Sequence, residues 1–371
     1  MTDAKGPAMP GPELQALAAC LSGSGLAEDS PQIAEFEMRL ASLAGLEQPG
    51  LATTSASAAM QLALTGLEIK AGECVVLSTL CEIRFVNPVI HLGIRPLLLD
   101  VEPTGLSLDP IALATFLDAQ CLRRGSAWFE RESGRRVAAV VLPHIGGLRP
   151  RRRDVLELCH RHGLALIELP ESLRDAELAS SAADARVLDF SHHEPGLGGG
   201  GALLSPHASV IQSARWWAGL CRSVGDQGPS DFGFQYRMPA LLAALGNARL
   251  ERIESEHSTQ SQSHGLPTTL LPFGPAVFAH HARRAWRIPE GSSFAACLEN
   301  LFPAGWTGER LPLPLHRQEL YAGFLSGSAP VAERAWQETL VARPVRPVAR
   351  APHLSVHESR SLVESGGRSP L

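Results

Sequence analysis

Short runs of hydrophobic residues alternate along the chain with longer segments in which hydrophobic residues recur every three or four positions. The short runs have the length of buried strands and lie at residues 73–78, 95–101, 137–143, 164–169, 185–191 and 201–205. The longer segments have the period of amphipathic helices and lie at residues 12–21, 55–69, 85–93, 109–121, 152–163 and 236–256. Because strands that are hydrophobic throughout are covered on both faces, this alternation predicts an α/β fold with a mostly parallel central sheet.

The length of the chain, 371 residues, is more than one hydrophobic core usually serves, so we expect two domains. Residues 1–12 are rich in proline and glycine and are expected to be disordered. We expect a large domain over residues 13–250, a small C-terminal α/β domain over residues 251–352 and a flexible tail over residues 353–371.

Composition and charge exclude several classes of partner. Hydrophobic residues at 44% and charged residues at 19% are typical of a globular protein, and a net charge of −5 gives no general attraction to nucleic acid or acidic lipid. The hydrophobic runs are too short to span a membrane, and the first residues lack the apolar core of a secretory signal. With seven scattered cysteines and no Cys-x-x-Cys pair, the expectation is a cytoplasmic protein with reduced thiols.

Two clusters of polar residues receive structural interpretations. His144, His160 and His162 lie within twenty residues, but their spacing does not form a metal site, so none is expected. The arginine-rich segment 149–153 is expected to form the solvent-facing start of a helix, and a site for an acidic ligand is the alternative.

Several segments, in order, are similar to motifs of one family. The segment "TSASAAMQLALTGLEIKAGECVVLS" (residues 54–78) looks like SGTAALHLAL…GI…GDEVIVPS, and "VVLPHIGGLRPRRRDVLELCHRHGLALIE" (residues 140–168) resembles IIPVHLYGQPADMDAI…KHGLPVIED. The segment "FGFQYRMPALLAALGNARLERI" (residues 232–253) is similar to GYNYRMSDLQAAIG.AQLERLD. Over roughly residues 30–345 the chain thus resembles the DegT/StrS family of sugar aminotransferases, which implies the pyridoxal phosphate-dependent aspartate-aminotransferase fold (fold type I).

The resemblance implies a lysine that forms a Schiff base with pyridoxal phosphate, and this lysine is missing. The family's loop S-F-H-P-T-K-N-L-T-T-G-E-G-G corresponds to "DFSHHEPGLGGGG" (residues 189–201), where counting from the two ends places the lysine position at His193 or at Glu194. The two lysines of the chain, Lys5 and Lys70, belong to other segments. Some family members, the deoxysugar 3-dehydratases, have a histidine at this position, where it acts as a base.

Other positions that the resemblance assigns to the cofactor are also altered. The aspartate expected opposite the pyridine nitrogen corresponds to Leu169, and Ser172 belongs to the same aligned segment. The stacking aromatic corresponds to Glu82. The phosphate-binding Ser-Gly-Thr corresponds to three residues at a helix start, Ser55, Ala56 and Ser57.

These changes favour a degenerate family member, a pseudoenzyme that binds no cofactor and serves as a scaffold or partner subunit in sugar or natural-product biosynthesis. The family's dimers share an active site through the segment that contains Gln235, so we expect a homodimer or a heterodimer with an active paralogue. One alternative is an enzyme that uses pyridoxal or pyridoxamine phosphate, either a nucleotide-sugar aminotransferase or a His193-dependent 3-dehydratase. Another is a binding module for a nucleotide sugar, with Gln235, Arg237, His316 and Tyr321 as ligand contacts.

Overall fold

The computed structural model describes most of the chain. The described residues are 11–22, 26–27, 29–172, 183–191, 193, 195–222, 228–256, 271–272, 284–301 and 306–344. Residues 1–10 and 353–371, expected to be disordered or flexible, lie outside this set. Pro12, the last residue of the expected N-terminal disorder, is the first residue of helix α1.

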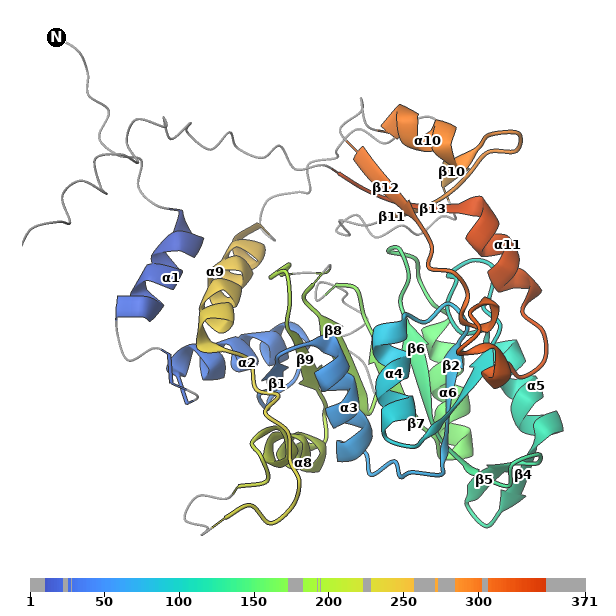
Figure 1. Cartoon of the computed structure of the whole chain (residues 1–371), viewed down its shortest axis with the longest axis horizontal. Helices are drawn as coiled ribbons and strands as arrows, with labels where there is room; N and C mark the ends of the chain where they lie inside the picture. Colours follow the sequence, from blue (N-terminus) through green and yellow to red (C-terminus); the bar gives the residue numbers. More distant parts are fainter. Residues whose placement is uncertain are drawn as a thin grey trace, which may run out of the picture.

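A nine-stranded mixed sheet forms the centre of the molecule (Figure 1). Seven strands follow the order β1-β9-β8-β7-β6-β2-β3, and their bounds are β1 (Leu51–Thr53), β2 (Cys74–Ser78), β3 (Arg95–Leu99), β6 (Arg136–Pro143), β7 (Ala165–Leu169), β8 (Ala185–Asp189) and β9 (Gly201–Leu204). The pairs from β8 to β3 are parallel, whereas β9 runs antiparallel to both β8 and β1. The predicted α/β fold with a mostly parallel sheet is therefore confirmed.

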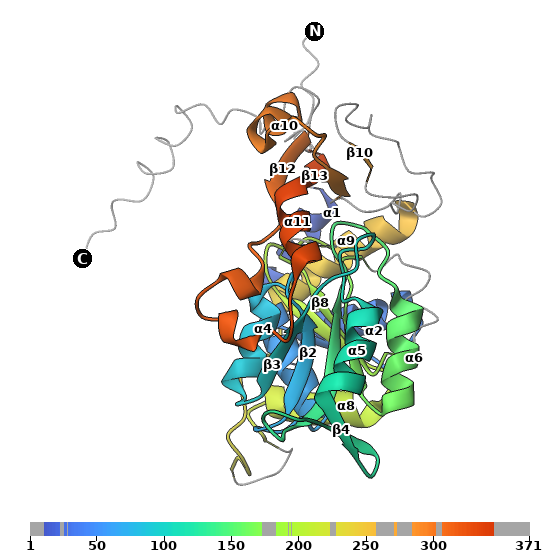
Figure 2. The same cartoon turned by 90° about the vertical axis from the view of Figure 1, so that its right-hand side faces the viewer.

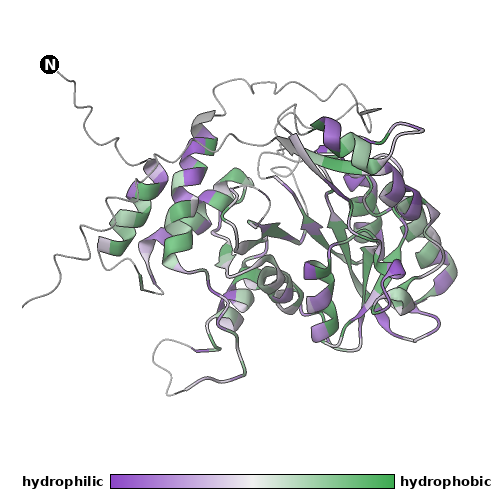
Figure 3. Ribbon diagram, turned by 45° about the horizontal axis from the view of Figure 1, so that its top comes forward, coloured by the Kyte–Doolittle hydropathy of each residue, from purple (hydrophilic) through white to green (hydrophobic). Residues whose placement is uncertain are grey.

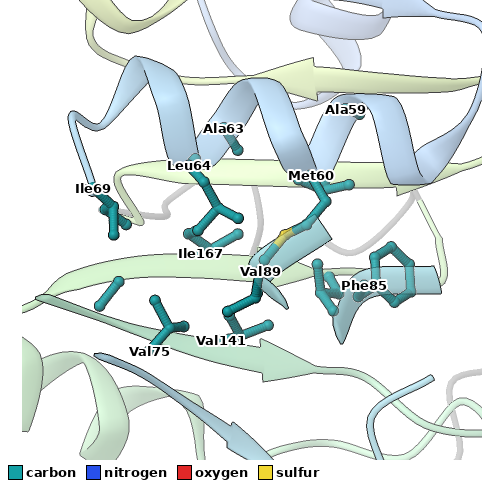
Figure 4. Close-up of a cluster of buried hydrophobic side chains, with 14 of the residues drawn as sticks. Ala59, Met60, Ala63, Leu64, Ile69, Val75, Phe85, Val89, Val141 and Ile167 are labelled. Carbon is teal, nitrogen blue, oxygen red and sulfur yellow. The ribbon is translucent and has the colours of Figure 1, made fainter. Parts of the chain in front are cut away.

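Helices cover both faces of this sheet. One face packs against α3 (Ala56–Gly66), α4 (Ile83–His91) and α8 (Ala208–Ala218), and Figure 4 shows the hydrophobic cluster between α3, α4 and the strands. The other face packs against α5 (Pro110–Gln120) and α6 (Arg152–His162) at one end, and against α2 (Pro31–Leu43) and α9 (Ala240–Glu256) at the other. Helix α1 (Pro12–Ser22) lies beside α9. Colouring by hydropathy shows green strands between helices that are purple on their outer sides (Figure 3).

A second, antiparallel sheet lies beyond the strand ends of the first sheet, on the side opposite β4 (Cys121–Arg124) (Figures 1 and 2). Its order is β10-β11-β13-β12, with β10 (Leu271–Pro272), β11 (Arg284–Arg287), β12 (Trp306–Arg310) and β13 (Thr339–Pro344). Two helices accompany it, α10 (Phe294–Leu301) and α11 (Pro330–Glu338), together with the 3-10 turns η1 (Leu315–Arg317) and η2 (Ala322–Phe324). The domain boundary near residue 250 stays a prediction.

A β-hairpin that the hydrophobic pattern does not predict extends the central sheet. Strands β4 (Cys121–Arg124) and β5 (Ala127–Glu130) pair with each other, and β5 continues onto β6. Figure 2 shows this hairpin at the end of the molecule opposite the second sheet. The sequence pattern does not predict this hairpin because β4 exposes Leu122, Arg123 and Arg124, so β4 lacks the hydrophobic pattern of a buried strand.

All seven cysteines of the chain are buried, and none of them forms a disulfide. Burial raises the pKa of the thiols of Cys121 and Cys159 to about 12, and that of Cys74 to about 11. Among the described residues, no three His, Cys, Asp or Glu side chains are grouped as a metal site requires. In the same part of the chain, no helix combines the length and the hydrophobicity needed to cross a membrane.

Candidate functional site

The predicted site residues gather at the carboxyl edge of the central sheet. Strands β2, β6, β7 and β8 are parallel, so their last residues and the following loops meet at this edge. Thr53 of β1 and Asp189 of β8 both pair with Gly201, so β1 ends at the same edge as β8. Helix α3 follows β1 directly in the chain. This register places the start of α3 beside the loop that follows β8.

The N-terminus of α3 is built by Ser55 and Ser57. Ser55 is the N-cap, and its Oγ accepts a hydrogen bond from the Ala58 amide at 3.1 Å. Ser57 Oγ donates to the carbonyl oxygen of Arg84 at 2.8 Å, which joins α3 to the first turn of α4. Ala56 lies between them and is buried, so the three residues predicted for phosphate binding form one helix start.

The glycine run 198–201 lets the chain approach this helix start closely. Gly200 forms a bridge with Ser55 and has a φ of +86°, which favours glycine. A Cβ on Gly201 would lie 2.6 Å from the Ala56 nitrogen and 2.7 Å from the Leu188 oxygen, both backbone atoms. The glycine run therefore allows β9 to pack closely against the start of α3.

An ion-pair cluster that the sequence analysis missed lies next to the start of α3. Arg84 Nη1 is 2.5 Å from Asp189 Oδ2, and Arg84 Nη2 is 2.6 Å from Glu82 Oε2. The side chain of Asp189 is 2% exposed, whereas that of Glu82 is 27% exposed. Glu82, predicted at the position of the stacking aromatic, is thus the N-cap residue of α4 and a partner of Arg84.

The loop after β8 carries His193, which is half-buried. Within this loop the Leu197 amide donates to the Phe190 oxygen at 2.8 Å, and the Gly196 amide donates to the His193 oxygen at 2.6 Å. Glu194, the other candidate for the lysine position, lies outside the described residues, as does Lys5. Lys70 is exposed at the opposite edge of the sheet, in the turn between α3 and β2.

The end of β7 presents an apolar residue toward α3 and α4. Leu169 is 4% exposed and belongs to the hydrophobic cluster on that face of the sheet. Glu168, its neighbour on the strand, points to the opposite face, as the two-residue period of a strand requires. Glu171 and Ser172 follow β7 and are buried, and one Glu171 oxygen accepts a hydrogen bond from the Gly147 amide at 2.8 Å.

Glu168 forms a buried charge cluster on that opposite face. Its carboxylate lies 3.0 Å from His144 Nε2, 2.7 Å from Arg152 Nε and 3.8 Å from Arg186 Nε. Burial by itself raises the pKa of Glu168, but the hydrogen bond and charge of His144, with the two guanidinium groups, outweigh it and lower the pKa to about 2. The expectation that segment 149–153 faces solvent throughout is therefore wrong for Arg152, which is held by this carboxylate.

The four predicted ligand contacts fall into two groups. Gln235 forms an isolated β-bridge with Gly219, and Arg237 forms one with Thr53. Because Thr53 is the last residue of β1, Arg237 lies beside the short segment that leads into α3. In the described part of the chain, the buried Nε of Arg237 has no hydrogen-bond partner.

The other two residues join the C-terminal part of the chain to the end of β2 and to helix α4. His316 Nδ1 lies 2.7 Å from Thr79 Oγ1, and its Nε2 lies 3.2 Å from Glu333 Oε1. The Tyr321 hydroxyl donates to Asn87 Oδ1 at 2.6 Å. Both side chains thus have partners within the protein, and their roles as ligand contacts stay predictions.

These residues fit a phosphate that is held without a covalent bond. A helix N-terminus attracts anions, and the unpartnered Arg237 Nε lies beside it. They do not fit a Schiff base, because the described residues at this edge include no lysine to form it.

The fold identifies the class of protein. The structure of Spr1654 from Streptococcus pneumoniae in its PLP form has a TM-score of 0.72 to this chain at 15% identity, and the match covers 95% of this chain and 94% of Spr1654. A central mixed sheet with a smaller second sheet is thus the architecture of the pyridoxal phosphate-dependent aminotransferases. The chain belongs to the DegT/DnrJ/EryC1/StrS aminotransferase family, whose model matches residues 8–284.

Two curated relatives illustrate the range of the family. EpsN of Bacillus subtilis strain 168 is named as a pyridoxal phosphate-dependent aminotransferase. It is 27% identical to this chain over 254 residues, which span 67% of this chain and 63% of EpsN. GDP-perosamine synthase of Caulobacter vibrioides is 25% identical over 349 residues, which span 88% of each chain.

These comparisons correct the expectation that the protein binds no cofactor. The family is one of aminotransferases, EpsN is named for pyridoxal phosphate dependence, and Spr1654 has been solved in both PLP and PMP forms. Positions 193 and 194 hold no lysine, whereas the capped start of α3 is formed. The expectation of no cofactor, which rests on the missing lysine, is therefore wrong.

Proposed function

We propose that the protein is a nucleotide-sugar enzyme of this family that holds pyridoxamine or pyridoxal phosphate without a covalent bond and uses His193 as its base. The observation that carries the proposal is the position of the His193 loop, at the sheet edge beside the start of α3, where the described residues include no lysine. This is the enzymatic alternative of the sequence analysis. Membership of an aminotransferase family and the two curated relatives support it over a scaffold role.

The residues of this edge have separable tasks. The start of α3 and Arg237 bind the cofactor phosphate, since both offer donors to an anion. When bound, the cofactor supplies an electron sink and, in its amine form, an amino group. His193 removes or returns a proton on the substrate, a task for which imidazole is suited near neutral pH. Leu169 provides apolar contact at the end of β7 and excludes water.

The test compares two histidine variants of the purified protein. We expect pyridoxamine phosphate to bind saturably to the wild type, to His193→Ala and to His160→Ala, in which an exposed helical histidine is removed. With a keto sugar linked to a nucleotide, His193→Ala loses activity by about 10²- to 10⁴-fold, whereas His160→Ala keeps it. Borohydride treatment of the pyridoxal phosphate complex should leave no adduct on the chain by mass spectrometry. Failure of both cofactor forms to bind, or a lysine adduct, contradicts the proposal.

For the quaternary state we propose a homodimer formed through the segment that contains Gln235. Phe232 in this segment is 94% exposed, and exposed aromatic side chains are enriched in subunit interfaces. In the same segment, the ring of Phe234 packs against the rings of Trp217 and Tyr236, which fixes the conformation of this part of the chain. A heterodimer with an active paralogue is the other outcome that the same surface allows.

A further inference from the structure

We infer that Arg84 is a positioning residue, which acts through Asp189 to hold the loop that carries His193 beside the start of α3. The inference deepens the proposed function and depends on it for its chemical meaning. Its physical basis is the chain of contacts that runs from α3 through Arg84 to this loop.

Arg84 connects three elements of the sheet edge. Its carbonyl oxygen accepts the Ser57 hydroxyl at the start of α3. Its Nη1 binds Asp189 Oδ2 at the end of β8, and the second oxygen of the same carboxylate, Oδ1, accepts the Ser191 amide at 2.9 Å. The carboxylate therefore transmits the position of Arg84 to the backbone two residues before His193.

The two ion pairs of Arg84 differ in strength. The Asp189 carboxylate is almost fully buried, so its charge depends on the guanidinium for compensation. The Glu82 pair is partly exposed and is screened by water, so it contributes less. The coupling of Arg84 to the loop therefore depends on Asp189 more than on Glu82.

Other contacts keep the base of the loop in place without Arg84. Phe190 is buried against Phe36, and its amide donates to the Gly200 oxygen at 3.2 Å. Asp189 itself is paired in the sheet with Gly201. Loss of the Arg84 contact should thus leave the sheet intact and release the segment from Ser191 onward.

The experiment measures amide hydrogen exchange of peptides covering residues 190–200 in protein without added cofactor. The variants are Arg84→Gln, Arg84→Lys, Asp189→Asn and the control Glu82→Gln. We expect Arg84→Gln and Asp189→Asn to speed exchange in this segment by about tenfold, with exchange in β6 unchanged, and Glu82→Gln to change it by less than about twofold. Arg84→Lys restores the charge and should recover part of the protection.

A second readout separates positioning from general stability. In the loosened variants, pyridoxamine phosphate should bind about fivefold or more weakly, while Arg84→Lys lies between them and the wild type. Unchanged exchange in both Arg84→Gln and Asp189→Asn, or an equal effect of Glu82→Gln, overturns the inference. If the wild type itself binds no cofactor, the proposed function fails, whereas the exchange experiment still decides the role of Arg84. Should Arg84→Gln not fold, Asp189→Asn and Arg84→Lys give the same decision.

Discussion

At the scale of single residues, the buried charge of Glu168 contributes to the way stability depends on pH. Its pKa falls from 4.5 to about 2 on folding, so the stabilisation is complete above pH 4.5 and is lost as the pH falls from 4.5 toward 2. A shift of this size corresponds to about 3 kcal/mol in the free energy of unfolding. Glu168→Gln removes the carboxylate charge that lies between Arg152, Arg186 and His144, and we expect it to lower stability at pH 7 by about 3 to 5 kcal/mol.

Urea unfolding of wild type and Glu168→Gln at pH 7 and pH 3 checks this expectation. The wild type should lose more stability than the variant between the two pH values. Asp154→Asn is the control, because the Arg151–Asp154 pair is about half exposed and contributes less than about 1 kcal/mol to the free energy of unfolding. Parallel pH curves for wild type and Glu168→Gln would contradict the assignment.

Two neighbouring glycines should respond oppositely to a methyl group. A Cβ on Gly201 meets backbone atoms of Ala56 and Leu188, so Gly201→Ala should destabilise the protein by about 1 to 3 kcal/mol. Gly199 has open space and no positive φ, so Gly199→Ala should leave stability unchanged or slightly higher. Thermal unfolding of the two variants measures the difference, and equal melting temperatures would refute the close packing.

The family resemblance groups Ser55, Ala56, Ser57 and Glu82, whereas the contacts that hold them have no signal in the sequence. In the structure these four residues lie at the starts of α3 and α4, and their roles toward a cofactor stay predictions. Arg84 and Asp189 are 105 positions apart in the sequence. The spacing of hydrophobic residues predicts single helices and strands, but it does not predict which helix start lies next to which strand end. Arg152 was misplaced for a similar reason, since its partner Glu168 lies on another element.

At the scale of elements, helix α11 is capped by a residue from the other sheet. Asp100 follows β3, and its carboxylate oxygens accept the amides of Val331 and Ala332 at 3.0 and 2.9 Å. Asp100→Ala should cost about 2 kcal/mol, because the first amides of α11 lose a charged acceptor. Asp109, the local N-cap of α5, is the comparison: Asp109→Ala should cost about 1 kcal/mol.

Hydrogen exchange locates the two effects. Asp100→Ala should speed exchange in residues 331–338, whereas Asp109→Ala should speed it only in α5. Protection of α11 that is equal in Asp100→Ala and wild type would show that the cap is unimportant.

The pattern of elements was more predictable than their exceptions. Buried strands and amphipathic helices each require a characteristic spacing of hydrophobic residues, so the sequence predicts the main α/β alternation and the structure confirms it. The β4–β5 hairpin was missed, since an exposed two-stranded extension has no hydrophobic period to detect. Helix α9 begins at Ala240 rather than at Tyr236, because the residue before Pro239 is disfavoured in a helix.

At the scale of the whole molecule, the proposed dimer should depend on Phe232. Sedimentation of the wild type should give about twice the chain mass of 39.6 kDa. Phe232→Ser should raise the dissociation constant of the dimer by about tenfold or more. Leu320→Ser also removes a large exposed side chain, which is 84% exposed, and should have no effect. A monomeric wild type, or a dimer indifferent to Phe232→Ser, would contradict the proposal.

The burial of every thiol has a practical consequence for work on this chain. Alkylating dyes react with the thiolate, and all seven native cysteines are shielded from solvent. One cysteine introduced at an exposed position such as Ser209 should therefore be the single fast-reacting group of the folded protein. Fluorophores or spin labels can be attached there with the native thiols left untouched, and slow labelling of the remaining seven then reports the rate at which the molecule opens.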